Sequence, residues 1–170
     1  TCTAGSGTFS CDFTTGVLAA ANSGSGITDG NIVTTANVDD AAGNSASPST
    51  GSAIQDTVDP TMTITSATVV SGATTATAAI VFTFTASQAT TNFVIGDITE
   101  SGCDLSAFGA IGGSTTAYAA TCTASGGDGA KTVLVAAEAF TDAAANGNGA
   151  ASNTYSWTYD GTGPTMVITS

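Results

Sequence analysis

The sequence repeats itself with a period of about one hundred residues, and this repetition limits its possible folds more than any other feature. Residues 60–66 read Pro-Thr-Met-Thr-Ile-Thr-Ser and residues 164–170 read Pro-Thr-Met-Val-Ile-Thr-Ser, so six of seven positions agree at a shift of 104. Asp-Ala-Ala-Gly-Asn at residues 40–44 matches Asp-Ala-Ala-Ala-Asn at residues 142–146, at a shift of 102. Landmarks that keep their order at a nearly constant offset indicate a tandem array of one structural unit.

The period predicts where the repeats begin and end. Residues 59–163 form one complete repeat, whereas residues 1–58 match only its later part, the C-terminal part of a repeat. Residues 164–170 match only its first strand and are expected to open the next repeat. Two interpretations remain open. The chain is an excerpt from a longer polypeptide, or strands from a neighbouring subunit complete the first repeat.

The complete repeat alternates apolar and polar residues in the manner of half-buried strands. We expect about seven strands, at residues 61–67, 76–86, 91–99, 105–108, 118–122, 131–139 and 153–160. Turn signals separate them, and this spacing predicts an all-β fold of two sheets with Greek-key connections. Tyr118, Tyr155, Trp157 and Tyr159 fall on the alternating segments and should pack in the core. The Ala-rich stretch at 138–145 is expected to be a loop, because Asn-Gly-Asn-Gly follows at once.

The charge balance excludes several partners. Thirteen acidic side chains face a single base, Lys131, which gives a net charge of −12. A single cationic side chain cannot neutralise a row of phosphates, so ordinary nucleic-acid binding is excluded and docking on anionic membranes is disfavoured. The sequence contains no apolar run of about 20 residues, so no membrane insertion is expected in this segment. It also contains no signal-peptide pattern, so a secretion signal would lie outside it.

The four cysteines form two local pairs, Cys2 with Cys11 and Cys103 with Cys122. The sequence has no His, and neither pair has the short spacing of a zinc knuckle. An even number of cysteines in a Ser-, Thr- and Gly-rich chain predicts two disulfides formed in an oxidising compartment. We therefore expect an extracellular or cell-surface location.

Several motifs together resemble a known family. They are Ile-Val-Phe-Thr-Phe-Thr-Ala-Ser at 80–87, Asn-Phe-Val-Ile-Gly-Asp-Ile-Thr at 92–99, and Tyr-Ser-Trp-Thr-Tyr-Asp-Gly-Thr-Gly-Pro at 155–164. With the 60–66 and 140–148 segments, they resemble the bacterial Ig-like tandem repeats of large adhesins and surface proteins. The resemblance implies tandem immunoglobulin-like β-sandwiches. The cysteine pairs look like an addition to the common pattern and favour a specialised extracellular filament.

One position departs from the family pattern. Where the first copy has Gly43, the second has Ala145. If the Gly serves a left-handed turn, that turn is expected to be altered in the second copy.

No catalytic constellation is present in the sequence, and we expect no enzymatic activity. Without His there is no Ser-His-Asp or Cys-His arrangement. Lys131 is interpreted as a solvent-facing residue on a strand edge. The alternative is a Lys–Asn isopeptide bond assisted by an acid such as Glu138. The Gly-Gly-Asp-Gly at 126–129 is a hairpin turn, since no phosphate-loop residues follow it.

Acidic residues near the repeat junctions are the candidate ligand groups. Carboxylates that converge where two repeats meet could bind Ca²⁺ and stiffen the hinge. Turn formation is the competing interpretation, because Asp before Gly or Pro is common in tight turns. The candidates are Asp40, Asp56, Asp59, Asp142 and Asp160.

Two functions are compatible with these observations. The first is a structural module of a secreted or surface filament or stalk, whose partners are neighbouring repeats and other copies of the protein. The second is an adhesive module that binds glycan or protein through its loops.

Overall fold

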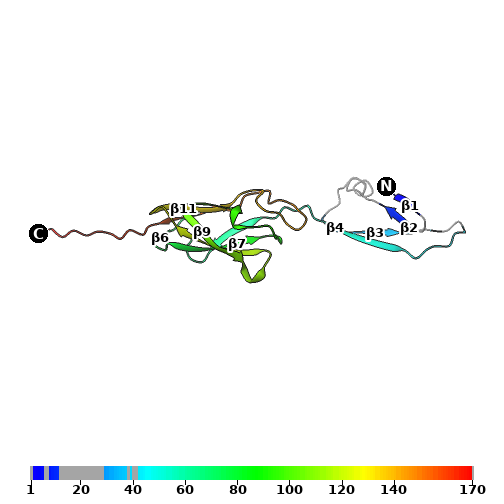
Figure 1. Ribbon diagram of the computed structural model, residues 1–170, viewed down its shortest axis with the longest axis horizontal. Helices are drawn as coiled ribbons and strands as arrows, with labels where there is room; N and C mark the ends of the chain where they lie inside the picture. Colours follow the sequence, from blue (N-terminus) through cyan, green and yellow to red (C-terminus); the bar gives the residue numbers. More distant parts are fainter. Residues whose placement is uncertain (1, 6–7, 12–28, 38, 40–41, 170) are drawn as a thin grey trace. The chain divides into compact units, whose positions relative to one another are not determined.

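The computed structural model describes residues 2–5, 8–11, 29–37, 39 and 42–169. The chain divides into two compact units, Thr1–Thr57 and Val58–Ser170 (Figure 1). Apart from two short 3₁₀ turns, the regular elements of the described residues are β-strands. The predicted all-β class is therefore confirmed.

The second unit is a sandwich of two four-stranded sheets. In the first sheet the strand order is β5-β7-β10-β9, and in the second it is β6-β12-β11-β8. All neighbours are antiparallel except β6 and β12. The first sheet contains β5 (Met62–Ser66), β7 (Ala79–Ala86), β9 (Cys103–Ala110) and β10 (Ala117–Ala124), and the second contains β6 (Thr74–Thr75), β8 (Ile98–Ser101), β11 (Gly129–Val135) and β12 (Tyr155–Tyr159).

The predicted strands differ from the observed ones by a few residues at their ends, and two of them differ more. The segment predicted at 91–99 becomes a strand only at Ile98, because Asp97 closes a 3₁₀ turn, η1 (Ile95–Asp97), in front of it. The Asp97 carboxylate accepts a hydrogen bond from Val94 N at 2.8 Å. The strand predicted at 131–139 ends at Val135, and the two-residue β6 was not predicted. A second 3₁₀ turn, η2 (Ile111–Gly113), follows β9.

The core lies between the two sheets and follows the predicted alternation. On β7, Ile80, Phe82 and Phe84 are fully buried, whereas Val81 between them is 50% exposed. The ring of Phe82 meets Trp157 of the opposite sheet, with 5.4 Å between centroids. Burying side chains of this size stabilises the fold by roughly 1.5–3 kcal/mol each.

The predicted burial of the strand aromatics is confirmed for three of the four. Tyr118, Tyr155 and Trp157 are buried, and Tyr159 is partly exposed. The Tyr118 hydroxyl donates to the carbonyl oxygen of Thr90 at 2.6 Å, and Tyr155 donates to that of Val69. Each buried phenol thus has an acceptor, as burial of a polar group requires.

The described residues of the first unit contain two strand pairs. Strands β1 (Cys2–Gly5) and β2 (Thr8–Cys11) pair with Cys2 directly opposite Cys11. Strands β3 (Gly30–Ala36) and β4 (Ser49–Gln55) are antiparallel over their full length. In chain order these strands occupy the places of β9 to β12 in the second unit. The repeat boundaries themselves stay a prediction.

Candidate functional site

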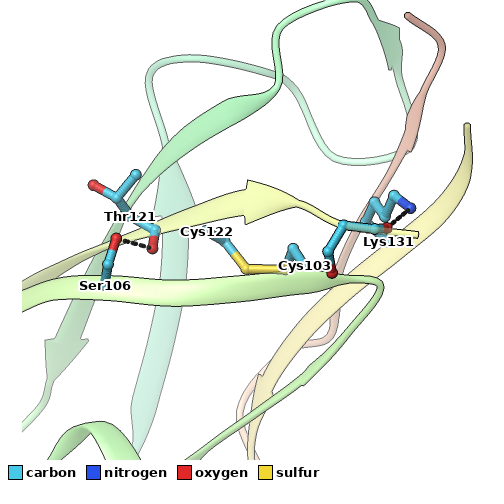
Figure 2. Close-up of a disulfide and its surroundings, with 6 residues drawn as sticks. Cys103, Ser106, Thr121, Cys122 and Lys131 are labelled. Carbon is cyan, nitrogen blue, oxygen red and sulfur yellow. Dashed lines mark hydrogen bonds between the residues drawn. A yellow bond between two sulfur atoms is a disulfide. The ribbon is translucent and has the colours of Figure 1, made fainter. Parts of the chain in front are cut away.

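The disulfide of the second unit joins two neighbouring strands of one sheet (Figure 2). Cys103 on β9 and Cys122 on β10 have Cα atoms 5.6 Å apart, a usual separation for a disulfide. The two residues are 4% and 0% exposed. Closing a 19-residue segment stabilises the folded state by about 3 kcal/mol on the chain-entropy estimate. This prediction is confirmed, whereas the predicted Cys2–Cys11 bridge involves side chains outside the described part.

Lys131 is buried, so the interpretation as a solvent-facing edge residue is wrong. Strand β11 lies between β12 and β8 rather than at an edge, and Lys131 is 3% exposed. Its Nζ donates to the carbonyl oxygens of Ser125 and Gly127, each at 2.8 Å. A Cβ on Gly102, whose φ is +73°, would lie 2.7 Å from Lys131 Cδ. Gly102 therefore leaves the room in which the lysine stem lies.

The groups needed for a Lys–Asn isopeptide bond lie in separate networks. The side chain of Asn148 is fully buried and accepts from Ala139 N and Phe140 N, at 2.7 and 3.0 Å. Its amide donates to two further carbonyl oxygens in the same loop. Glu138 lies against Gly147 beside this loop. The structure therefore assigns Lys131 to the turn at residues 125–128 and Asn148 to the loop before β12.

The Asp142 carboxylate holds the loop in which it lies. One of its oxygens accepts from Ala144 N at 2.8 Å and Asn146 N at 2.9 Å, and the other accepts from Asn146 Nδ2 at 2.9 Å. Burial by itself raises the pKa of Asp142, but these hydrogen bonds outweigh it and hold the pKa below its usual value. These hydrogen bonds give Asp142 the turn-forming role that was the alternative interpretation to Ca²⁺ binding.

The Gly-to-Ala replacement in this loop leaves the turn in place. Gly43 has a φ of +86° and Ala145 has a φ of +70°. The expectation of an altered turn is therefore wrong. The loop keeps its left-handed residue, and Ala145 carries the steric cost of that conformation.

The other candidate acids are distributed along the chain. Asp59 lies against Gly149, and Asp160 accepts from Thr162 N at 3.2 Å in the turn after β12. Asp56 follows β4, and Asp40 lies outside the described residues. Asp142 lies in the loop before β12, and Asp160 directly follows that strand. Among the described residues no group of three acids, cysteines or histidines gathers. Calcium binding stays a prediction.

Asp128 is a functional candidate that the sequence reasoning missed. It lies in the turn before β11 and accepts hydrogen bonds from Gly161 N at 2.7 Å and from the Thr162 hydroxyl. The pKa of Asp128 lies below its usual value, first because of the Thr162 hydroxyl and next because of the Gly161 amide. Lys131 makes a smaller contribution. The available signal was that Asp-Gly precedes both β3 and β11, at residues 29–30 and 128–129.

A shallow pocket of about 490 Å³ lies between the edge strands β8 and β9. It combines aliphatic side chains with two carboxylates, and its lining residues are Ile95, Gly96, Ile98, Glu100, Asp104 and Leu105.

The described residues contain no helix that could cross a membrane.

Comparison with known proteins gives one match. A family model of the bacterial Ig-like domain matches residues 56–159, more than half of the chain. Comparisons with curated proteins and with solved structures gave no match. Bacterial Ig-like domains form a non-catalytic fold family and often occur in surface proteins. The strand order, the core and this match agree, and the chain belongs to the bacterial Ig-like domain family.

Proposed function

We propose that the chain is a structural module of a secreted or cell-surface filament or stalk built from tandem Ig-like repeats. The observation that carries this proposal is the different burial of two nearly identical segments. In β5, Met62 and Ile64 are 4% and 2% exposed. Their counterparts Met166 and Ile168 are 88% and 90% exposed. A segment with the apolar face of a first strand is explained most simply as the first strand of a following repeat.

The connections of the second unit suit a module that transmits tension. Its first strand, β5, and its last strand, β12, belong to different sheets. The Asn153 side chain, just before β12, links them by accepting from Ile64 N at 2.7 Å and donating to Ile64 O at 3.0 Å. The disulfide lies on β9 and β10, away from both strands. Tension applied to the ends would therefore reach the core strands before the disulfide-closed segment.

Electron microscopy of the native material tests this proposal. If such sandwiches form an array, the fibres should show a regular axial repeat of about 40 Å. A strand of 8 residues spans about 26 Å, and the loops at its ends add to that length. Dispersed monomers without an axial repeat would contradict the filament. A longer recombinant chain with two complete repeats provides the matched control.

The pocket between β8 and β9 supports a second candidate, an adhesive module. Its aliphatic floor beside Glu100 and Asp104 would suit a protein ligand with apolar and basic side chains. Binding to a panel of basic peptides, measured for the wild type and for E100A/D104A, tests it. Loss of binding in the double variant supports adhesion, and equal binding by both proteins contradicts it. T63A, on the exposed face of β5, is a control outside the pocket.

Calcium at the repeat junctions is a further proposal about the same array. It predicts that EDTA lowers the melting temperature of the chain and that added Ca²⁺ restores it. An unchanged melting curve would end the calcium hypothesis. Asp142 is both a candidate ligand and bonded within its loop, so D142N is compared with the wild type in EDTA and in Ca²⁺. A lower melting temperature in EDTA reports loop damage, and a smaller response to Ca²⁺ reports loss of metal binding.

A further inference from the structure

The segment that leaves the second unit is bonded back onto that unit. After β12 the chain runs through Gly161 and Thr162 to Pro164. The Asp128 carboxylate holds the first two of these residues, accepting from the Gly161 amide and the Thr162 hydroxyl. A Cβ on Gly161 would also meet the Tyr159 ring, with Tyr159 Cζ 2.8 Å away. The exit segment is therefore fixed both by hydrogen bonds and by contact.

The first unit contains the same arrangement with different residues. Asp29 accepts from the backbone N and the hydroxyl of Thr57, at 2.8 and 2.7 Å. Asp29 comes directly before β3, as Asp128 comes directly before β11. In each unit one carboxylate thus binds one amide and one hydroxyl of the segment that follows the last strand.

The correspondence between the two units is positional as well as chemical. Thr57 and Gly161 stand at the same distance before Pro60 and Pro164. The glycine after each Asp has a nearly identical φ, +135° at Gly30 and +133° at Gly129. Residues other than glycine rarely adopt this backbone conformation. In the second copy the hydroxyl belongs to Thr162, one position later than the counterpart of Thr57, and it still donates to the Asp carboxylate. Two copies that reach one contact by different residues indicate that the contact itself is required.

The linker between the units is held on its other side as well. Gln88 Nε2 of the second unit donates to the carbonyl oxygen of Val58 at 2.6 Å. Thr57 and Val58 are consecutive, so a single peptide bond separates the residue held by Asp29 from the residue held by Gln88.

We propose that Asp29 and Asp128 are linker latches, which hold the segment between repeats against the repeat before it and so restrict how the next repeat moves. This inference rests on the proposed tandem array. In the second unit, Lys131 also fixes the turn that presents Asp128, by donating to the carbonyls of Ser125 and Gly127.

Amide hydrogen exchange on the 170-residue chain tests the latch itself. In D128A the Gly161 amide should exchange on the order of tenfold faster, since it loses a charged acceptor. In T162V, which removes only the hydroxyl, we expect a smaller increase. The amide of Val133 in the core should be unchanged in both, which separates latch loss from unfolding. Equal Gly161 exchange in D128A and the wild type would overturn the latch.

Nitrogen-15 relaxation of the same chain tests the effect on the repeats. D29A should let the two units tumble more independently, because it releases the linker between them. D128A is the matched control, since its latch lies after the second unit and its loss should leave this motion unchanged. Wild-type relaxation in D29A, or an equal change in both variants, would overturn the proposed restriction. T57V, which removes only one of the two hydrogen bonds, covers the case in which D29A fails to fold.

These outcomes are separable from those of the array. If fibres form but D29A has no effect, the latch is wrong and the array stands. If no fibres are found but D29A releases the units, the array is wrong and the latch stands.

Discussion

Lys131 is the chain's only cationic side chain, and its burial gives it a structural task. An ammonium group in a buried position is stable only when hydrogen bonds compensate for lost water. The carbonyl oxygens of Ser125 and Gly127 provide that compensation. The cation thus fixes a glycine-rich turn that would otherwise have many conformations.

K131M should lower the stability of the second unit by about 2 kcal/mol, because it keeps the apolar stem but removes both charged hydrogen bonds. Urea unfolding followed by the fluorescence of Trp157, the only tryptophan, measures this unit selectively. T63A, on the exposed face of β5, should change the stability by less than about 0.5 kcal/mol. An unchanged midpoint for K131M would show that the turn does not depend on the lysine.

Ala145 occupies the position that Gly43 occupies in the matching segment, and this replacement costs stability. Its φ of +70° is left-handed, as is that of Gly43 in the first copy. A145G should therefore stabilise the second unit by about 1 kcal/mol, since glycine removes the steric penalty of the left-handed conformation. The matched control is A143G in the same loop, which should be neutral or destabilising. Trp157 fluorescence during urea unfolding again reports the change, and a lower midpoint for A145G would contradict it.

The hydrogen-bonded carboxylates make the stability depend on pH. The pKa of Asp142 in the folded protein is lowered because the Asn146 and Ala144 hydrogen bonds outweigh the effect of burial, and that of Asp128 is lowered chiefly by Thr162 and Gly161. A lowered folded-state pKa adds stability above the unfolded value of about 3.9, and this stability disappears as the pH falls through the folded-state pKa. The melting temperature should therefore fall between pH 5 and pH 2.

D142N tests the contribution of one of these groups. Its melting temperature at pH 7 should be lower than that of the wild type, and its decrease on acidification should be smaller. The decrease should not vanish, because Asp128 still titrates. A D142N curve parallel to the wild-type curve would show that Asp142 contributes nothing to the acid sensitivity.

At the scale of elements, alternation identified most strands because each strand buries one face. It failed at residues 91–97, where Phe93 and Ile95 suggest a strand but Asp97 closes a 3₁₀ turn. It could not find β6, since two residues contain no period and their pairing with β12 is purely tertiary. The position of β11 inside its sheet, which buries Lys131, is likewise a long-range property.

The candidate site was likewise only partly predictable from the sequence. The Cys103–Cys122 bridge was predictable because its partners lie on neighbouring strands close in sequence. The Asp128 latch was not, because the residues that it binds lie 33 and 34 positions away. The shared role of the two Asp-Gly pairs becomes visible only in the structure, where each Asp accepts from one amide and one hydroxyl.

The disulfide should limit how far the second unit extends under force. Single-molecule pulling on the chain ends should give a contour-length increment roughly 60 Å longer for C103A/C122A, because the closed 19-residue segment becomes free to extend. This double variant leaves Cys2 and Cys11 unchanged, so the difference reports one bridge alone. Equal increments for the two proteins would show that the bridge is absent in solution.

At the scale of the whole molecule, charge decides how copies of the chain meet. The net charge is −12, and the single cation is buried beneath a turn, so the surface carries acids without compensating bases. Copies or repeats that approach side by side therefore repel each other through their uncompensated carboxylates. In the proposed array, where a covalent linker joins the repeats, lengthwise contacts do not depend on attraction between surfaces. We therefore expect the proposed array to associate lengthwise rather than side by side at low salt.

Light scattering of the chain at different salt concentrations tests this argument. At 10 mM NaCl the screening length is about 30 Å and repulsion should give a clearly positive second virial coefficient. At 1 M NaCl the screening length falls to about 3 Å, and the coefficient should fall towards zero. Comparing CaCl₂ with MgCl₂ at one ionic strength separates screening from specific binding, since screening affects both alike. A coefficient that ignores salt would mean that apolar contacts outside the charged surface govern association, and the repulsion argument would fail.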